Sequence, residues 1–81
     1  MPLLTFRYYA SARAAAGTSE ELVEADSVSA AVAVLLARHD DTFARVVGAS
    51  SMLLDGTRLD DRDAPIRADA EVHVLPPFAG G

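Results

Sequence analysis

The chain has 81 residues, of which 51% are hydrophobic and 23% charged, with a formal net charge of −5. This length supports one domain with a single core, and no apolar run approaches the length of about 20 residues that a membrane-spanning helix needs. The sequence has no cysteine and no lysine, which excludes disulfides, thiolate catalysis and Schiff-base chemistry. The acidic balance argues against nucleic-acid binding through a basic surface. No basic stretch precedes the first apolar residues, so we predict no signal peptide and expect a cytoplasmic protein.

The first third of the chain predicts a strand hairpin. Residues 3–9 alternate, which assigns one side of a strand to the core and the other to solvent. The core side comprises Leu4, Phe6 and Tyr8, and the opposite side Thr5, Arg7 and Tyr9. Residues 10–19 are mostly small and include Gly17, which predicts a loop or turn. Residues 20–25 are then expected to return as a second strand beside the first.

The middle of the chain predicts one main helix within residues 26–41. Its apolar side chains recur at helical spacing on a single face, namely Val28, Val32, Leu35, Leu36 and His39. Ser29 is the favoured N-cap and Ser27 the alternative. We expect the helix to end near His39, and residues 42–51 to be irregular, with at most a helical turn that places Phe43 and Val47 on the core.

The last third predicts three short strands. Asp55-Gly56 is a turn signal between two apolar stretches. Residues 60–70 are polar and rich in turn formers, with Pro65 and Ile66 fixing the loop to the core. Residues 71–75 form the last strand, with Val72 and Val74 facing inward. Pro76-Pro77 ends this strand because proline donates no hydrogen bond to a ladder.

The resulting order of strand, strand, helix, strand, strand, strand predicts an α+β protein. One helix on one face of a mixed sheet fits a β-grasp (ubiquitin-like) roll, with the first and last strands side by side in the middle. We expect residues 1–75 to form the β-grasp domain and residues 76–81 an extended, flexible diglycine tail.

The tail, "PPFAGG", has the features of a segment that a partner enzyme binds and modifies. Gly80 and Gly81 carry no side chain that blocks a narrow channel. Pro76 and Pro77 restrict where the tail points, and six extended residues reach about 20 Å. A carboxylate at Gly81 becomes reactive after attack on the α-phosphate of ATP, and sulfur can then displace AMP. The alternative is a frayed end without a role.

The stretches "RYYASARAAAG", "APIRADAEVHVLPP" and "VLPPFAGG", in a chain of this overall plan, resemble the small subunit of molybdopterin synthase. That family contains the sulfur carriers of molybdenum cofactor biosynthesis, within the ubiquitin-like sulfur-carrier superfamily. The resemblance covers essentially the whole chain, and its most specific part is the C-terminal motif.

The resemblance implies that an E1-like enzyme adenylates Gly81 and that a sulfurtransferase converts it to a thiocarboxylate. The sulfur would then pass to cyclic pyranopterin monophosphate. The tail would insert into the large synthase subunit, in a heterotetramer of two small and two large subunits. The inserted residues would be Pro76, Pro77, Phe78, Ala79, Gly80 and Gly81. The chain would bind no cofactor and no metal, with ATP consumed by the activating enzyme, and would be a non-catalytic subunit.

Four further residues are expected to contact the partner. Tyr9 and Leu75 point away from the core, and the resemblance makes that sheet face a docking surface. Leu59 is the apolar partner-facing candidate of its region, with Arg58 as the alternative, and Arg13 could pair with an acidic group. Isolated exposed apolar residues are common and need no role. The alternative for each of these residues is therefore that it is exposed without a binding role. Phe78 occupies a position where the resemblance implies a smaller apolar residue.

Three other functions fit the same sequence. One is a sulfur carrier for thiazole or cysteine biosynthesis, although the paired prolines favour the molybdopterin pathway. The second is a ubiquitin-like modifier attached to target lysines, and the third is a plain interaction domain. His73 is expected to be a surface residue, His39 to end the helix, and the aspartates at positions 60, 61 and 63 to form a solvated loop rather than a metal site.

Overall fold

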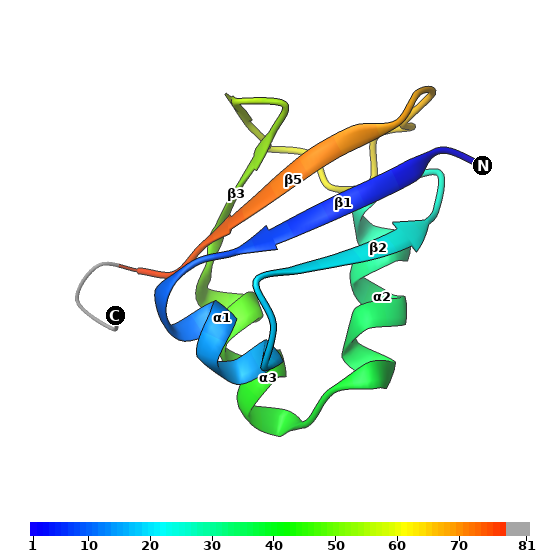
Figure 1. Ribbon diagram of the computed structural model, residues 1–81. Helices are drawn as coiled ribbons and strands as arrows, with labels where there is room; N and C mark the ends of the chain where they lie inside the picture. The colour runs from blue at the N-terminus through cyan, green and yellow to red at the C-terminus, as the bar shows by residue number, and fades with distance from the viewer. Residues whose placement is uncertain (78–81) are drawn as a thin grey trace.

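A five-stranded mixed sheet is the centre of the fold (Figure 1). The computed structural model describes residues 1–77. The strands are β1 (Leu3–Tyr8), β2 (Glu20–Glu24), β3 (Ser51–Leu54), β4 (Thr57–Arg58) and β5 (Ala70–Leu75), in the order β2-β1-β5-β3-β4. β1 and β5 are parallel neighbours in the middle of the sheet, and the other neighbours are antiparallel. This arrangement confirms the predicted β-grasp class and the central position of the first and last strands.

The core lies between one face of this sheet and three helices, α1 (Ala10–Ala16), α2 (Val28–Arg38) and α3 (Asp41–Ala49). The strand alternation is confirmed, because the inward residues are fully or nearly fully buried: Leu4, Phe6, Tyr8, Val72 and Val74. Burial of each large apolar side chain contributes about 1.5–3 kcal/mol. The sheet therefore has one covered face and one outer face free for contacts.

The prediction of a loop over residues 10–19 is wrong, since Ala10–Ala16 form α1. Alanine has the highest helix propensity, which favours a helix even without an apolar stripe. Ala12 is its one buried residue. The helix ends at Gly17, whose φ of 75° lies in the left-handed region and whose N–H donates to the Arg13 carbonyl.

The main helix is confirmed, and its predicted N-cap is corrected. The Ser27 hydroxyl, not that of Ser29, accepts a hydrogen bond from the Ala30 N–H at 3.1 Å. The Ser29 hydroxyl instead donates a hydrogen bond to Asp63 in the loop between β4 and β5. The helix ends before His39, as predicted. Its predicted face is too wide, because Leu36 is 40% exposed; the buried residues are Val28, Ala31 and Leu35.

The stretch expected to be irregular is the full helix α3. The Asp40 carboxylate accepts a hydrogen bond from the Phe43 N–H at 3.1 Å and so caps the helix. Phe43 and Val47 are buried in the core, as predicted. The next predicted turn is also confirmed, because Asp55 and Gly56 both have positive φ values and join β3 to β4.

The long loop between β4 and β5 is fixed to the rest of the domain. Ile66 is half-buried against the core, and its N–H donates to the Asp26 carbonyl at 2.7 Å. Among residues 1–77, no helix is long and apolar enough to cross a membrane.

Candidate functional site

The candidate site is the outer face of the sheet where β1 and β5 end. The parallel register of these strands pairs Arg7 with His73. Tyr9 follows directly after β1, and Leu75 is the last residue of β5. Because the two strands run in the same direction, Tyr9 and Leu75 lie at the same end of the sheet, where the chain leaves the domain. Tyr9 is 40% exposed.

A continuous chain of hydrogen bonds, here called the outer-face chain, joins four side chains on β1, β5 and the residue after β1. The Tyr9 hydroxyl lies 2.6 Å from His73 Nδ1, and His73 Nε2 lies 2.8 Å from Glu71 Oε1. Glu71 Oε2 lies 2.9 Å from Arg7 Nε. A neutral His73 with its proton on Nε2 fits both contacts, because it accepts from the phenol and donates to the carboxylate.

In the outer-face chain, the ion pair between Arg7 and Glu71 holds the rings of His73 and Tyr9 in place. The hydrogen bond from Arg7 lowers the pKa of Glu71, and the same bond raises the pKa of Arg7. Glu71 is therefore ionised at neutral pH and holds the His73 ring, whose plane lies 13° from that of Tyr9. The result is an exposed aromatic ring in a fixed orientation, a feature typical of protein–protein contact sites.

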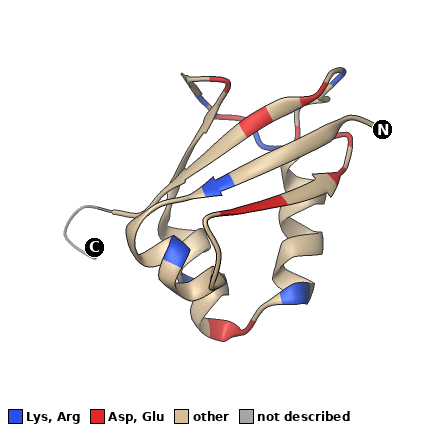
Figure 2. Cartoon of the chain, viewed as in Figure 1, with Lys and Arg blue, Asp and Glu red and all other residues tan. Residues whose placement is uncertain are grey.

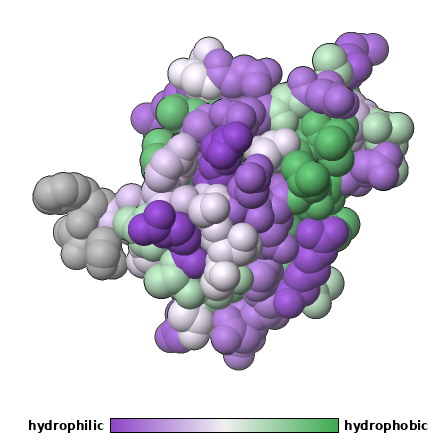
Figure 3. All heavy atoms as spheres, in the orientation of Figure 1, coloured by the Kyte–Doolittle hydropathy of each residue, from purple (hydrophilic) through white to green (hydrophobic). Residues whose placement is uncertain are grey.

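Apolar side chains border the outer-face chain. Leu53 on β3 is paired with His73, and Leu75 is paired with Ser51; both leucines are half-buried. A second apolar area lies over β2 and the start of β1 (Figure 3), where Leu22 is 52% and Leu3 37% exposed. The outer face thus has an apolar area at each end, and only the one at Tyr9 and Leu75 adjoins the C-terminal exit.

The other predicted contact residues lie apart from this surface. Leu59 is half-buried against the core, and its N–H donates to the Met52 carbonyl at 2.9 Å. Its alternative, Arg58, is exposed and forms an ion pair with Asp60 at 3.4 Å. Arg13 is exposed on α1. The structure thus brings Tyr9 and Leu75 together and does not add Leu59 or Arg13 to them.

The chain leaves the sheet through Pro76 and Pro77. β5 ends at Leu75, as the prolines predict, and Pro76 is half-buried while Pro77 is exposed. The remaining predicted tail residues lie outside the described part of the chain: Phe78, Ala79, Gly80 and Gly81.

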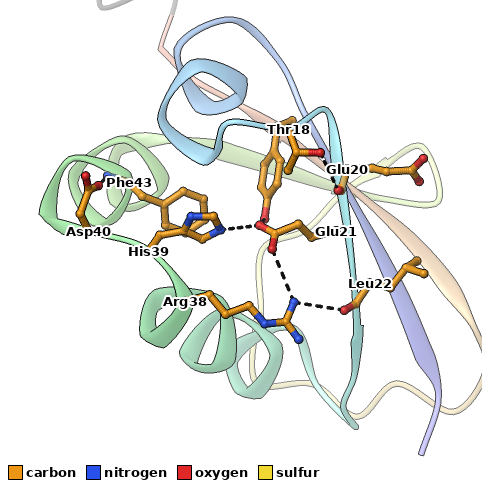
Figure 4. A network of polar contacts seen from close by, with 9 residues as sticks. Thr18, Glu20, Glu21, Leu22, Arg38, His39, Asp40 and Phe43 are labelled. Carbon is orange, nitrogen blue, oxygen red and sulfur yellow. Dashed lines mark hydrogen bonds and ion pairs between the residues drawn. The ribbon is translucent and has the colours of Figure 1, made fainter.

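A second polar cluster connects β2 to the turn between α2 and α3 (Figure 4). The Glu21 carboxylate accepts a hydrogen bond from the Tyr8 hydroxyl at 2.9 Å and contacts His39 Nε2 at 2.5 Å. Arg38 lies 3.5 Å from the same carboxylate. Burial and then the contact with Glu21 raise the pKa of Tyr8. His39 also stacks on Phe43. These contacts join core elements, so we assign the cluster to stability.

Over residues 1–77, the charged side chains do not gather into a basic surface. Acidic and basic segments are interspersed over strands, helices and loops (Figure 2). Among residues 1–77, no group of three or more histidine, aspartate or glutamate side chains is placed to hold a metal ion.

Sequence reasoning treated His73 as an ordinary surface residue and gave Glu71 no role. The alternation of β5 places both on the outer face, which was predicted. Their connection to Tyr9 and Arg7 depends on the register between β1 and β5, and the two strands are separated by most of the chain. The available signal was the pair of ionisable residues two positions apart on an outward strand face.

No protein-family model and no curated protein matches the sequence. Solved structures share its fold. Small archaeal modifier protein 1 (SAMP1) from Methanosarcina acetivorans aligns with a TM-score of 0.84 and 21% identity over 100% of this chain and 98% of that chain. A putative molybdopterin converting factor subunit 1 from Pyrococcus furiosus aligns with a TM-score of 0.80 and 21% identity over 96% and 100%.

A third similar structure comes from a complex. It is the protein–protein complex of subunits 1 and 2 of the molybdopterin-converting factor from Helicobacter pylori, with a TM-score of 0.71 and 15% identity over 98% of this chain and 99% of that chain. These likenesses confirm, at the level of the fold, the resemblance stated from the sequence.

Proposed function

We propose that this protein is the sulfur-carrier subunit of a molybdopterin synthase. The strongest support for this proposal is the place where the chain leaves the sheet, at Pro76 and Pro77. A surface formed by the oriented rings of Tyr9 and His73 and by Leu75 adjoins Pro76-Pro77, which lead toward the diglycine. A partner can therefore bind the outer face while its active site receives the tail. The similar molybdopterin-converting factor subunit solved in complex with a second subunit supports a large-subunit partner.

The proposed chemistry needs only a reachable carboxylate from this chain. A Gly81 carboxylate oxygen attacks the α-phosphorus of ATP, which forms an acyl-adenylate and releases pyrophosphate. The terminal sulfur of a sulfurtransferase persulfide then attacks the acyl carbon and releases AMP, which leaves an acyl disulfide. A second thiol cleaves its S–S bond, which releases the Gly81 thiocarboxylate and forms a disulfide with the donor sulfur. The activating E1-like enzyme, the sulfurtransferase and the large subunit would supply the catalytic groups. We place these ATP-dependent steps in the cytoplasm.

The tail length fits this division of roles. Six residues from Pro76 to Gly81 reach about 20 Å when extended. The sulfur would leave the carrier for cyclic pyranopterin monophosphate inside the large subunit, and hydrolysis would return the carrier to its carboxylate form. In this proposal two small and two large subunits form the synthase.

A second candidate is a protein modifier. It is favoured by the similarity to a structure named as a small archaeal modifier protein. In that case the activated Gly81 carboxyl carbon would be attacked by a lysine amine of a target protein, with formation of an amide bond. The two candidates share the activation step and differ in the acceptor.

Intact mass measurement on the protein purified from its native host distinguishes them. The carrier proposal predicts a fraction in which one sulfur replaces one oxygen at Gly81. The modifier proposal predicts amide-linked adducts to other proteins and no thiocarboxylate. The same measurement establishes whether Gly81 carries the free carboxylate of the mature protein. If deletion of Gly81 leaves molybdoenzyme activity intact in a strain without a second copy, the carrier proposal is wrong.

Docking is tested with a matched pair of variants. Tyr9→Ala removes the oriented ring beside Pro76, and Leu22→Ala removes an apolar side chain that is at least as exposed, at the other end of the outer face. We expect Tyr9→Ala to weaken binding to the large subunit at least tenfold, since aromatic contact residues of this kind carry 2 kcal/mol or more, an about 30-fold effect. Leu22→Ala should change it less than threefold. Equal effects of the two variants would contradict the assigned docking surface.

A further inference from the structure

The sheet has one long edge that is open to a further strand, and β2 forms it. In the part of the chain that the structure describes, β2 pairs only with β1 and lies at the edge of the sheet beside α2 (Figure 1). The opposite edge is formed by β4, which has only two residues. The unpaired side of an edge strand carries backbone groups that a strand of another molecule can bond.

The backbone groups of alternate β2 residues point toward this open side. The Tyr8 N–H donates to the Ser19 carbonyl at 2.9 Å, so these two residues form a hydrogen-bonded pair of the antiparallel ladder. Such pairs recur at every second residue. The residues between them therefore direct their N–H and C=O groups away from β1, namely Glu20, Leu22 and Glu24.

On the open side of β2, two carbonyls have donors while the N–H groups lack acceptors. Arg38 donates to the Leu22 carbonyl at 3.3 Å (Figure 4), and the Thr18 hydroxyl donates to the Glu20 carbonyl at 3.2 Å. The Arg38 contact is long for a hydrogen bond, and its side chain is 44% exposed, so an incoming strand can displace it. The N–H groups of Leu22 and Glu24 have no acceptor among residues 1–77.

The side chains along this edge are apolar at the centre and acidic on either side. Leu22 is 52% exposed on the outer face, and Val34 of α2 is 41% exposed. Val34 lies one helical turn before Arg38, which reaches β2, so it is on the side of α2 that faces the edge. Glu20 and Glu24 are exposed two residues before and after Leu22, at the two ends of β2 (Figure 2). Neither forms an ion pair within residues 1–77.

This charge pattern disfavours a second copy of β2 as the added strand. Antiparallel pairing of two β2 strands about Leu22 would place Glu20 of each copy directly opposite Glu24 of the other. Like charges directly opposite each other destabilise a strand pair, whereas opposite charges stabilise it. The same two carboxylates would attract arginine or lysine side chains at those positions. The edge therefore fits a basic strand from a different protein.

We propose that the open side of β2 binds an extended, basic segment of another protein as an added antiparallel strand. The segment has an apolar residue opposite Leu22 and an arginine or lysine two positions to either side, opposite Glu20 and Glu24. Its backbone exchanges hydrogen bonds with Leu22 and replaces Arg38 at the Leu22 carbonyl. Because β1 separates β2 from β5, this binding leaves the surface beside Pro76 free and goes beyond the proposed sulfur transfer.

Nuclear magnetic resonance on the full-length, isotopically labelled protein tests the added strand with a defined probe. The probe is the peptide Thr-Arg-Thr-Val-Thr-Arg-Thr with blocked termini. At saturation it should shift the amide signals of Leu22 and Glu24 and slow their hydrogen exchange at least tenfold. The N–H groups of Glu21 and Val23 point to β1 and should keep their exchange rates within twofold. A peptide with proline in place of the valine keeps both charges but lacks the central N–H, and it should bind at least tenfold more weakly.

Variants of the protein separate the two glutamates from the overall negative charge. Glu20→Gln and Glu24→Gln should each weaken binding of the probe about threefold, the effect of one cross-strand charge pair. Asp41→Asn removes the same charge from α3, away from β2, and should change binding less than 1.5-fold. Arg38→Ala should strengthen binding at least twofold, because it frees the Leu22 carbonyl and removes a positive charge beside the edge.

Several results would overturn the proposal. It is wrong if the probe leaves the exchange of the Leu22 and Glu24 amides unchanged, or if the proline peptide binds equally well. Equal weakening by Asp41→Asn and Glu24→Gln would show that net charge alone attracts the probe. Slow exchange of both amides without the probe, increasing with protein concentration, would assign the edge to a second copy of this chain. None of these results depends on whether Gly81 carries a thiocarboxylate.

Discussion

Replacement of Glu21 with alanine should cost the domain a large share of its stability. Tyr8 is only 2% exposed, and its hydroxyl donates to Glu21 at 2.9 Å. Without the carboxylate, this buried hydroxyl loses its partner, at a cost of about 1–3 kcal/mol. The lost contact with His39 adds about 1 kcal/mol. We therefore expect the free energy of unfolding to fall by about 2–4 kcal/mol.

Urea unfolding followed by far-ultraviolet circular dichroism measures this change. In thermal unfolding, a loss of 2 kcal/mol corresponds to a Tm about 8–16 °C lower for a domain of this size. Glu24→Ala, on the same strand, is the matched control, since Glu24 is exposed and should cost no more than about 0.5 kcal/mol. Glu21→Gln keeps an oxygen acceptor for Tyr8 and should cost about 1 kcal/mol.

A double-mutant cycle tests the assigned cause. Tyr8→Phe removes the hydroxyl that Glu21→Ala leaves without a partner, so the double variant should be more stable than additivity predicts by about 1 kcal/mol. Additive effects would show that the Tyr8 hydroxyl does not account for the loss. If Glu21→Ala unfolds within 0.5 kcal/mol of Glu24→Ala, the stabilising role of the cluster is refuted.

Three further predictions concern single contacts. The pKa of Glu71 is lowered, so its pairing with Arg7 stabilises the fold at pH values above its ordinary pKa of 4.5, and this stabilisation is lost as the pH falls through the folded-state pKa. The difference in urea stability between wild type and Arg7→Gln should therefore vanish in acid. A difference that stays constant with pH would refute this. Ser27→Ala should cost about 1 kcal/mol and Ser29→Ala less, because only Ser27 caps α2; the reverse order would contradict the cap. Gly17→Ala should cost about 1 kcal/mol from its φ of 75°, and Gly17→Asn less, as measured by thermal unfolding.

The strands and the fold class could be predicted because alternation and burial agree along β1 and β5. Leu4, Phe6 and Tyr8 recur with period two, and all three are buried. α1 could not be predicted from periodicity, since its residues are small and only Ala12 is buried. α3 was not predicted as a helix: the spacing of Phe43 and Val47 indicated at most one helical turn. Apolar periodicity does not predict a helix whose formation depends on helix propensity and capping rather than on an apolar stripe.

The candidate site, too, could be predicted only in part. The outward orientation of Tyr9 and Leu75 follows from alternation alone. The hydrogen bond between Tyr9 and His73 requires the parallel register of β1 and β5, which alternation does not determine.

The parallel pairing of β1 with β5 also sets the order in which the domain can be built. The register joins Tyr8 to Val74, so the middle of the sheet forms only after the chain has been synthesised through β5. Pairing across so long a separation is slow because the loop must close before any contact is gained. An incomplete chain has β1 and β2 but lacks the strand that carries His73 and Leu75. The surface formed by Tyr9, His73 and Leu75 therefore exists only once the chain has been synthesised through β5, and a partner that binds it distinguishes such chains from shorter ones.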